Sequence, residues 1–220
     1  MKSAVFALLL VVAGAFAFPQ SDDPRPTLEE RIKDVIERIS TRIRDAGFDP
    51  LEIENVRFEH VYEPEVIELV AFLENLSFVG ASKIDVNHIE FLPFINRLTF
   101  DVSLPGLEMS LGGAGVNAVF FQYSLDALLS GSFSVHGIRA AGEINFNIGL
   151  DGVTVRSITI DLYFGVPQSD LSLEINGKDL SGELNYILGV LIPNFLEESR
   201  NEINRGAETI VRFLIDNHYN

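Results

Sequence analysis

The sequence contains no cysteine and no tryptophan among its 220 residues. Without cysteine, the chain has no disulfide framework, no cysteine-ligated zinc and no thiol nucleophile. Basic residues are also scarce: 16 Lys and Arg stand against 32 Asp and Glu, which gives a formal net charge of -16. So acidic a chain lacks the clustered positive charge that nucleic acids and anionic lipid surfaces attract. We therefore expect no nucleic-acid partner, and a fold that depends on its hydrophobic core alone.

Long hydrophobic runs are missing except at the N-terminus. Lys2 is followed by an apolar run over residues 4–16 and by Ala15-Phe16-Ala17, the small-x-small pattern of a cleavage site. This run is too short to cross a bilayer, and no later segment has the roughly 18 apolar residues that a membrane helix needs. The sequence therefore predicts a signal peptide over residues 1–17 and a secreted, extracellular protein without integral membrane contact. The remaining residues 18–220 are long enough to bury a core as one domain.

One sequence motif fits a passage through the secretory pathway. Asn75-Leu76-Ser77 is an N-glycosylation sequon, so Asn75 is the candidate glycosylation site. The site can be used only if the fold leaves Asn75 exposed.

A helix is predicted directly after a short polar leader. Thr27 and Glu30 have the spacing of a capping box, in which each side chain binds the backbone amide of the other residue. The apolar residues that follow recur every three or four positions and so share one face. Gly47 and Asp49-Pro50 should end the helix. We expect it to pack on a sheet; a helix lying on a membrane surface is the alternative, which the mixed charges of its polar face disfavour.

From about residue 69 to residue 175 the apolar period changes from 3.6 to two. The alternation is clearest over residues 98–104, 144–150, 158–164 and 171–175. Repeated alternation predicts an antiparallel sheet with one wet face and one dry face. Turns are expected at Pro105-Gly106 and in a hairpin loop over residues 112–115.

The C-terminal region, residues 181–217, returns to helical spacing. Pro193 should kink or restart the helix. Residues 184–196 are apolar nearly all round, which is typical of a helix buried on most sides. A sheet that rolls around this helix would bury it, whereas a flat sheet would leave part of it exposed.

Motifs that would indicate catalysis or a bound cofactor are weak. Residues 113–118 match the pattern G-x-G-x-x-A, but a strand rather than a helix follows them, so a nucleotide site is not expected. His60 has Glu63 and Glu65 nearby, but this stretch contains Pro64 and reads as irregular, so we interpret His60 as a surface residue rather than a metal ligand. We predict no catalytic residue, no metal and no cofactor. The sequence leaves open whether the fold brings two carboxylates together as a catalytic pair.

Large apolar side chains are the remaining feature, with 17 Phe in a chain that is 47% hydrophobic. They could form a tightly packed core or line a cavity for an apolar ligand, and the pattern does not separate the two. If a cavity exists, inward sheet positions and one helix face should line it. The candidate ligand-binding residues are Phe72, Phe78, Phe100, Val102, Phe121, Phe133, Phe146, Ile148, Leu162, Phe164, Leu184, Leu188, Leu191 and Phe195.

This layout resembles the group 7 mite allergens and their insect relatives over essentially the whole mature chain. The resemblance is carried by residues 39–50, by Ser130-Gly131-Ser132-Phe133-Ser134-Val135-His136-Gly137 and by residues 188–203. More distantly, the chain is similar to the juvenile-hormone-binding and takeout proteins and to the bactericidal/permeability-increasing family, all of which are tubular lipid-binding (TULIP) folds. The absence of cysteine favours the group 7 branch, because the hormone-binding and takeout proteins typically carry an N-terminal disulfide.

The resemblance implies an α+β fold, a TULIP-like super-roll in which a highly curved antiparallel sheet wraps a long helix, with an N-terminal amphipathic helix beside it. It also implies that a ligand lies between helix and sheet. We therefore expect a non-enzymatic protein that sequesters or transports an apolar or amphipathic small molecule or lipid. The alternative is a recognition protein with a filled core, which would bind a microbial glycolipid or a protein through exposed loops such as Phe91-Leu92-Pro93-Phe94.

Overall fold

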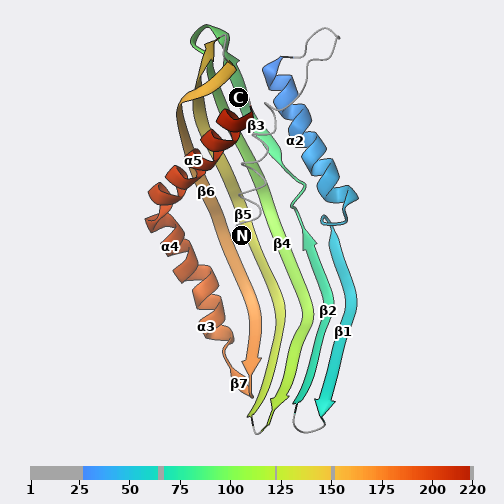
Figure 1. Cartoon of the computed structure of the whole chain (residues 1–220). Coiled ribbons are helices and arrows are strands. Elements are labelled where there is room, and N and C mark those ends of the chain that lie inside the picture. The colour runs from blue at the N-terminus through green and yellow to red at the C-terminus, as the bar shows by residue number, and fades with distance from the viewer. Residues whose placement is uncertain (1–26, 64–66, 122, 150–151, 219–220) are drawn as a thin grey trace.

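A long, curved antiparallel sheet with helices on one side forms the molecule (Figure 1). The computed structural model describes residues 27–63, 67–121, 123–149 and 152–218, so the predicted signal peptide lies outside the described residues. The strands are β1 (Leu51–Glu63), β2 (Ile67–Val79), β3 (Asp85–Leu92), β4 (Arg97–Phe120), β5 (Tyr123–Gly149), β6 (Gly152–Ile175) and β7 (Lys178–Asp179). The order is β1-β2-β4-β5-β6-β7, with β3 also paired to β4. The helices are α2 (Leu28–Asp45), the 3-10 turn η1 (Pro93–Ile95), α3 (Ser181–Tyr186), the π-helical turn η2 (Ile187–Leu191), α4 (Ile192–Glu198) and α5 (Arg200–His218).

The N-terminal helix forms as the sequence predicts. The Thr27 amide donates to Glu30 at 2.7 Å, and the Glu30 amide donates to the Thr27 hydroxyl at 3.2 Å, so the capping box is complete. Ile32, Val35 and Ile36 are buried on one face of α2. Glu29 also accepts a hydrogen bond from the Phe91 amide at 2.8 Å, which fastens α2 to the outer edge of β3.

The strands extend further than the alternation indicates. β1 begins at Leu51, so His60 lies in a regular strand rather than in an irregular stretch. The prediction failed there because residues 55–61 are exposed on both faces, and such a strand lacks a clean pattern. His60 itself is exposed, and its ring stacks on Phe58 with 6.4 Å between the ring centroids.

β4 is continuous through both of its predicted turns. Pro105 lies where the neighbour of β4 changes from β3 to β2, a position at which a strand tolerates a proline. Residues 112–115 form no hairpin loop; they hold a β-bulge, at which the pairing of β4 with β5 shifts register between Leu111 and Ala114. The glycines are needed there because neighbouring groups approach closely: a Cβ on Gly115 would lie 2.3 Å from the ring of Phe72.

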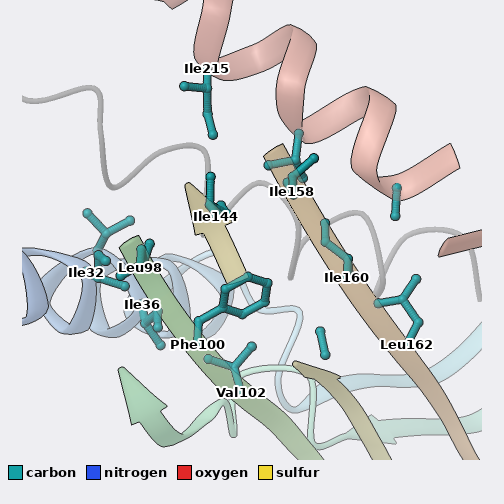
Figure 2. Close-up of a cluster of buried hydrophobic side chains, with 14 of the residues drawn as sticks. Ile32, Ile36, Leu98, Phe100, Val102, Ile144, Ile158, Ile160, Leu162 and Ile215 are labelled. Atoms are coloured by element: carbon teal, nitrogen blue, oxygen red, sulfur yellow. The ribbon is translucent and has the colours of Figure 1, made fainter. Parts of the chain in front are cut away.

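The upper half of the molecule, as drawn in Figure 1, is a filled core. Figure 2 shows Ile32 and Ile36 of α2, Ile215 of α5 and inward strand residues such as Phe100 in one cluster. Leu98, Ile144, Val211 and Ile215 are completely inaccessible to solvent. This part of the sheet therefore has its dry face covered by α2 and α5.

Helix α5 also covers the free edge of β6. Four of its polar residues, four positions apart, bond to the exposed backbone of the strand. Asn204 accepts from Leu162 N at 3.1 Å, Glu208 from Ile160 N at 3.1 Å, and Asp216 from Val155 N at 2.9 Å, while Arg212 donates to Val155 O at 2.7 Å. An edge strand covered in this way offers fewer free groups to another chain. We call Asn204, Glu208, Arg212 and Asp216 the edge ladder.

The C-terminal helix does not restart at the proline, because the backbone before it, at Leu191 and Ile192, keeps right-handed helical φ and ψ. Pro193 occupies the first turn of α4, directly after η2. The expectation that residues 184–196 are buried on most sides is wrong, because only one face of this segment packs on β6. Phe195 is 62% exposed, and Ile187, Val190 and Leu191 are also exposed.

Candidate ligand-binding site

In the lower half of the sheet, none of the described helices covers β1, β2 or β4 (Figure 1). The uncovered side carries apolar residues. It is the continuation of the helix-facing side: along β5, Val135 and Phe133 face the helices, and Leu129 and Leu125 follow at alternate positions. We define the open apolar face by the following residues. They are Val56 and Phe58 of β1, Leu73 of β2, Val116 of β4, and Leu125 and Leu129 of β5.

Strand pairing places these side chains on the same side of the sheet. Val56 pairs with Leu73, Leu73 with Ala114, and Ala114 with Leu129. Directly paired residues in an antiparallel sheet share a face, so the four strands contribute to one surface. Phe58 remains 55% exposed on it, and Val56, Val116 and Leu125 are exposed as well.

A pocket of about 230 Å³ lies where the C-terminal helices meet the sheet. Phe133 and Val135 of β5 form one wall, Phe164 of β6 adds to it, and Leu188 and Ile192 close it from the helix side. Glu197 reaches its rim and pairs with Arg200 at 3.3 Å. Most of the lining side chains are apolar, and Asn194 and Glu197 are the polar ones, so the arrangement suits an apolar or amphipathic group.

The structure brings together only part of the predicted ligand-binding set. Four members are buried in the filled core: Phe100, Val102, Phe146 and Leu162. Three line the pocket: Phe133, Phe164 and Leu188. Three are half-buried elsewhere: Phe72, Phe78 and Leu184. Four are exposed: Phe121, Ile148, Leu191 and Phe195.

On the sheet, three placements differ from the inward position that the sequence predicts. Phe72 pairs with Gly115, and Gly115 with Leu128, so Phe72 lies on the face opposite Leu129. Its ring covers the glycine, which leaves room for an aromatic side chain on the outer face. Phe121 does not belong to a strand; it lies in the turn after β4 with a φ of 54°. A third residue, Ile148, lies near the end of β5 and is exposed there.

The open apolar face was missed in part because residues 51–63 were not expected to form a strand. A signal was present: Val56 and Phe58 alternate with Asn55, Arg57 and Glu59. Alternation with only two apolar positions is short, however, and strands are recognised over four to eight residues. The pairing of β1 with β2 shows that this short alternation belongs to a strand.

Apart from the Glu197–Arg200 pair at the pocket rim, the main charged contacts involve residues outside the pocket lining. On the other face of the sheet, Arg139 donates to Asp101 at 2.7 Å, and this bond holds the pKa of Asp101 below its ordinary value. Arg200 lies over the ring of Tyr163, 4.0 Å from the ring centroid, and pairs with Asp161 at 3.0 Å. These contacts are structural, because each cation has a partner that neutralises it.

The remaining predictions concern glycosylation, metal binding and membrane contact. Asn75 is exposed in β2 at the bulge, with a φ of 49°, and its glycosylation stays a prediction. Within the described residues, no cluster of three His, Asp or Glu could hold a metal ion. Over the same residues, no helix is both long enough and apolar enough to span a membrane.

Comparison with known proteins gives a family. The family model described as "Haemolymph juvenile hormone binding protein (JHBP)" matches residues 6–220. A search of curated proteins finds no match. Among solved structures, Takeout 1 of Epiphyas postvittana is similar at a TM-score of 0.39 and 12% identity, over 86% of this chain and 90% of that one. A lipopolysaccharide-binding protein is similar at a TM-score of 0.23 and 12% identity, over 74% of this chain and 32% of that one.

Both TM-scores are low, so the assignment rests on the family model, which spans nearly the whole chain. The match confirms the expected resemblance to the hormone-binding and takeout proteins and the TULIP-like fold. The absence of cysteine had favoured the group 7 branch, yet the match is to the hormone-binding family, so the missing disulfide does not separate the chain from that family. The chain belongs to the haemolymph juvenile hormone binding protein family.

Proposed function

We propose that this protein is a secreted, non-enzymatic carrier that sequesters an apolar or amphipathic small molecule or lipid. The observation that carries the proposal is the apolar pocket between Phe133, Phe164 and Leu188, which lies beside the open apolar face. Membership of the hormone-binding family supports an apolar ligand, and the N-terminal residues 1–17 support secretion.

The size of the pocket indicates how a ligand would lie. Pockets for small-molecule ligands usually measure roughly 300–1,000 Å³, whereas this pocket measures about 230 Å³. One end of an elongated ligand fits the pocket, and the rest would lie along the open apolar face. Each buried methylene contributes about 0.8 kcal/mol, so an acyl or isoprenoid chain gains ample affinity without a charged anchor.

Direct recovery of a ligand tests the proposal. The secreted protein should be purified, extracted with organic solvent and examined by native mass spectrometry, and its binding of the fluorescent probe anthroyloxy stearate should be titrated. We expect either a co-purified apolar molecule or saturable binding of the probe with a stoichiometry near one. Absence of both results would refute the carrier function.

One observation favours a second function, recognition of a partner by a protein with a filled core. Phe94, in η1 between β3 and β4, is completely exposed, and Leu92 and Ile95 beside it are also exposed. Exposed apolar groups of this kind mark contact sites when they gather in one place. A protein that binds no probe but retains a partner lost in a Phe94→Ser variant would support recognition instead of transport.

A further inference from the structure

An aromatic group lies at the lower end of the sheet, where β4 ends and β5 begins. Phe120 is 55% exposed, Phe121 69% and Tyr123 72%. We call these three residues the aromatic tip. Three large rings in contact with water are costly, so their position calls for an explanation beyond packing.

The backbone at the tip is also unusual. Phe121 adopts a φ of 54°, in the left-handed region that bulky residues avoid. Glycine or asparagine would occupy this position with less strain. Residues in such sparsely populated backbone conformations cluster at functional sites.

The aromatic tip continues the open apolar face. Phe120 pairs with Tyr123, and Ala118 pairs with Leu125, so Phe120 and Tyr123 follow Val116 and Leu125 at alternate positions. Figure 1 shows the end of β1, the start of β2 and the end of β4 in this order at this end of the molecule. An apolar molecule at the tip could therefore move onto the open apolar face without crossing water.

The charge around the aromatic tip indicates which kind of lipid surface it could contact. Residues 116–127 contain no Lys or Arg and one acid, Asp126; on the adjacent strand β2, Glu68 pairs with Val119, and the whole chain has a net charge of -16. Attraction to anionic lipid therefore contributes nothing. Phe and Tyr rings do enter the interface of a neutral bilayer, where their apolar bodies are buried.

We propose that the aromatic tip docks on a zwitterionic lipid surface, from which the apolar ligand passes directly to the open apolar face. This proposal rests on the carrier function for the transfer step, whereas docking itself does not. The opposite end of the sheet is not equivalent: Phe94 is even more exposed than the tip residues, but the core beneath that end is filled by residues such as Leu98 and Ile144.

The test uses phosphatidylcholine vesicles, the full mature chain and two matched variants. Phe120→Ser/Phe121→Ser/Tyr123→Ser removes the aromatic tip, and Phe94→Ser removes a fully exposed ring at the other end. The first readout is co-flotation of the protein with vesicles that contain no probe. The second is the rate at which anthroyloxy stearate moves from vesicles to the protein, measured against vesicle concentration.

We expect the tip variant to lose flotation and to slow transfer by about tenfold or more, because the apolar area of three rings no longer enters the bilayer. Its equilibrium affinity for the probe without vesicles should be unchanged, and Phe94→Ser should behave as the unaltered protein. A single Phe121→Ser variant, checked by circular dichroism, gives a smaller loss and replaces the triple variant if that one does not fold.

Three results would overturn the docking proposal: no flotation of the unaltered protein, equal transfer rates in the tip variant, or an equal loss in Phe94→Ser. A tip-dependent dimer in sedimentation, without vesicle binding, would also overturn it and would identify a second copy as the partner. Flotation without any probe uptake would retain docking and reject the carrier function, so the two proposals fail separately.

Discussion

The amide of Val155 on β6 donates a hydrogen bond of 2.9 Å to the carboxylate of Asp216 on α5. The carbonyl of the same Val155 accepts from Arg212 at 2.7 Å, so one helix satisfies both backbone groups of a residue on the sheet edge. This edge ladder holds α5 along β6. The buried residues Val211 and Ile215 are thereby kept over the core.

Breaking the edge ladder should destabilise the fold by a moderate amount. Glu208→Ala removes the acceptor of Ile160 N, and a lost hydrogen bond that leaves a partly buried amide unpaired costs about 1–2 kcal/mol. Urea unfolding monitored by circular dichroism gives this difference. Arg205→Ala, at an exposed position of α5, is the control and should change stability by less than about 0.5 kcal/mol. Equal effects of the two substitutions would contradict a role for the edge ladder.

Asp49 connects two turns and should make stability depend on pH. Its carboxylate accepts from the amides of Gly80 at 2.9 Å and Ser82 at 2.6 Å. Burial by itself raises the pKa of Asp49, but the hydrogen bonds from Ser82 and Gly80 outweigh it and hold the pKa below its ordinary value. A lowered pKa in the folded state means that the stabilisation is complete above the pKa of the unfolded chain, and is lost as the pH falls through the folded value.

We therefore expect Asp49→Asn to lose about 2 kcal/mol of stability at neutral pH, because the amide cannot accept both bonds as well as a carboxylate. The gap between the variant and the unaltered protein should shrink as the pH falls through the acidic range. Chemical unfolding at a series of pH values measures both quantities. A gap that stays constant with pH would show that Asp49 does not act through its charge.

The filled part of the core should respond strongly to truncation. Phe100 is buried on β4 beneath α2 and α5, so Phe100→Ala should cost about 3–5 kcal/mol through lost contacts and the cavity that remains. Phe94→Ala removes the same atoms from an exposed site and should have little effect. Thermal unfolding compares the two. A small effect at Phe100 would indicate that this half of the molecule is not tightly packed.

The pocket wall can be tested without disrupting the core. Leu188 is half-buried and closes the pocket from η2, so Leu188→Asn should weaken the binding of anthroyloxy stearate by about tenfold, since it replaces apolar contact with a polar group. Fluorescence titration measures the affinity. Val190→Asn, on the same turn but exposed and outside the pocket wall, is the matched control. Equal losses in both variants would place the ligand elsewhere.

The sequence by itself determined the helical and strand segments wherever local chemistry is sufficient. The Thr27–Glu30 capping box depends on groups within one turn of each other, and it appears where expected. The alternation over residues 98–104 likewise specified which side chains enter the core, because pleating places alternate residues on opposite faces.

Only the tertiary structure decided which apolar residues remain uncovered. Phe100 and Phe133 look alike in sequence, yet α2 and α5 bury the first completely, while the second borders a pocket. The glycines at 112–115 read as a turn, but strands on both sides continue the pairing and make them a bulge. The local sequence of a strand does not indicate which helix will cover it, since coverage depends on contacts between segments that are distant in the chain. The open apolar face and the aromatic tip are consequences of that coverage.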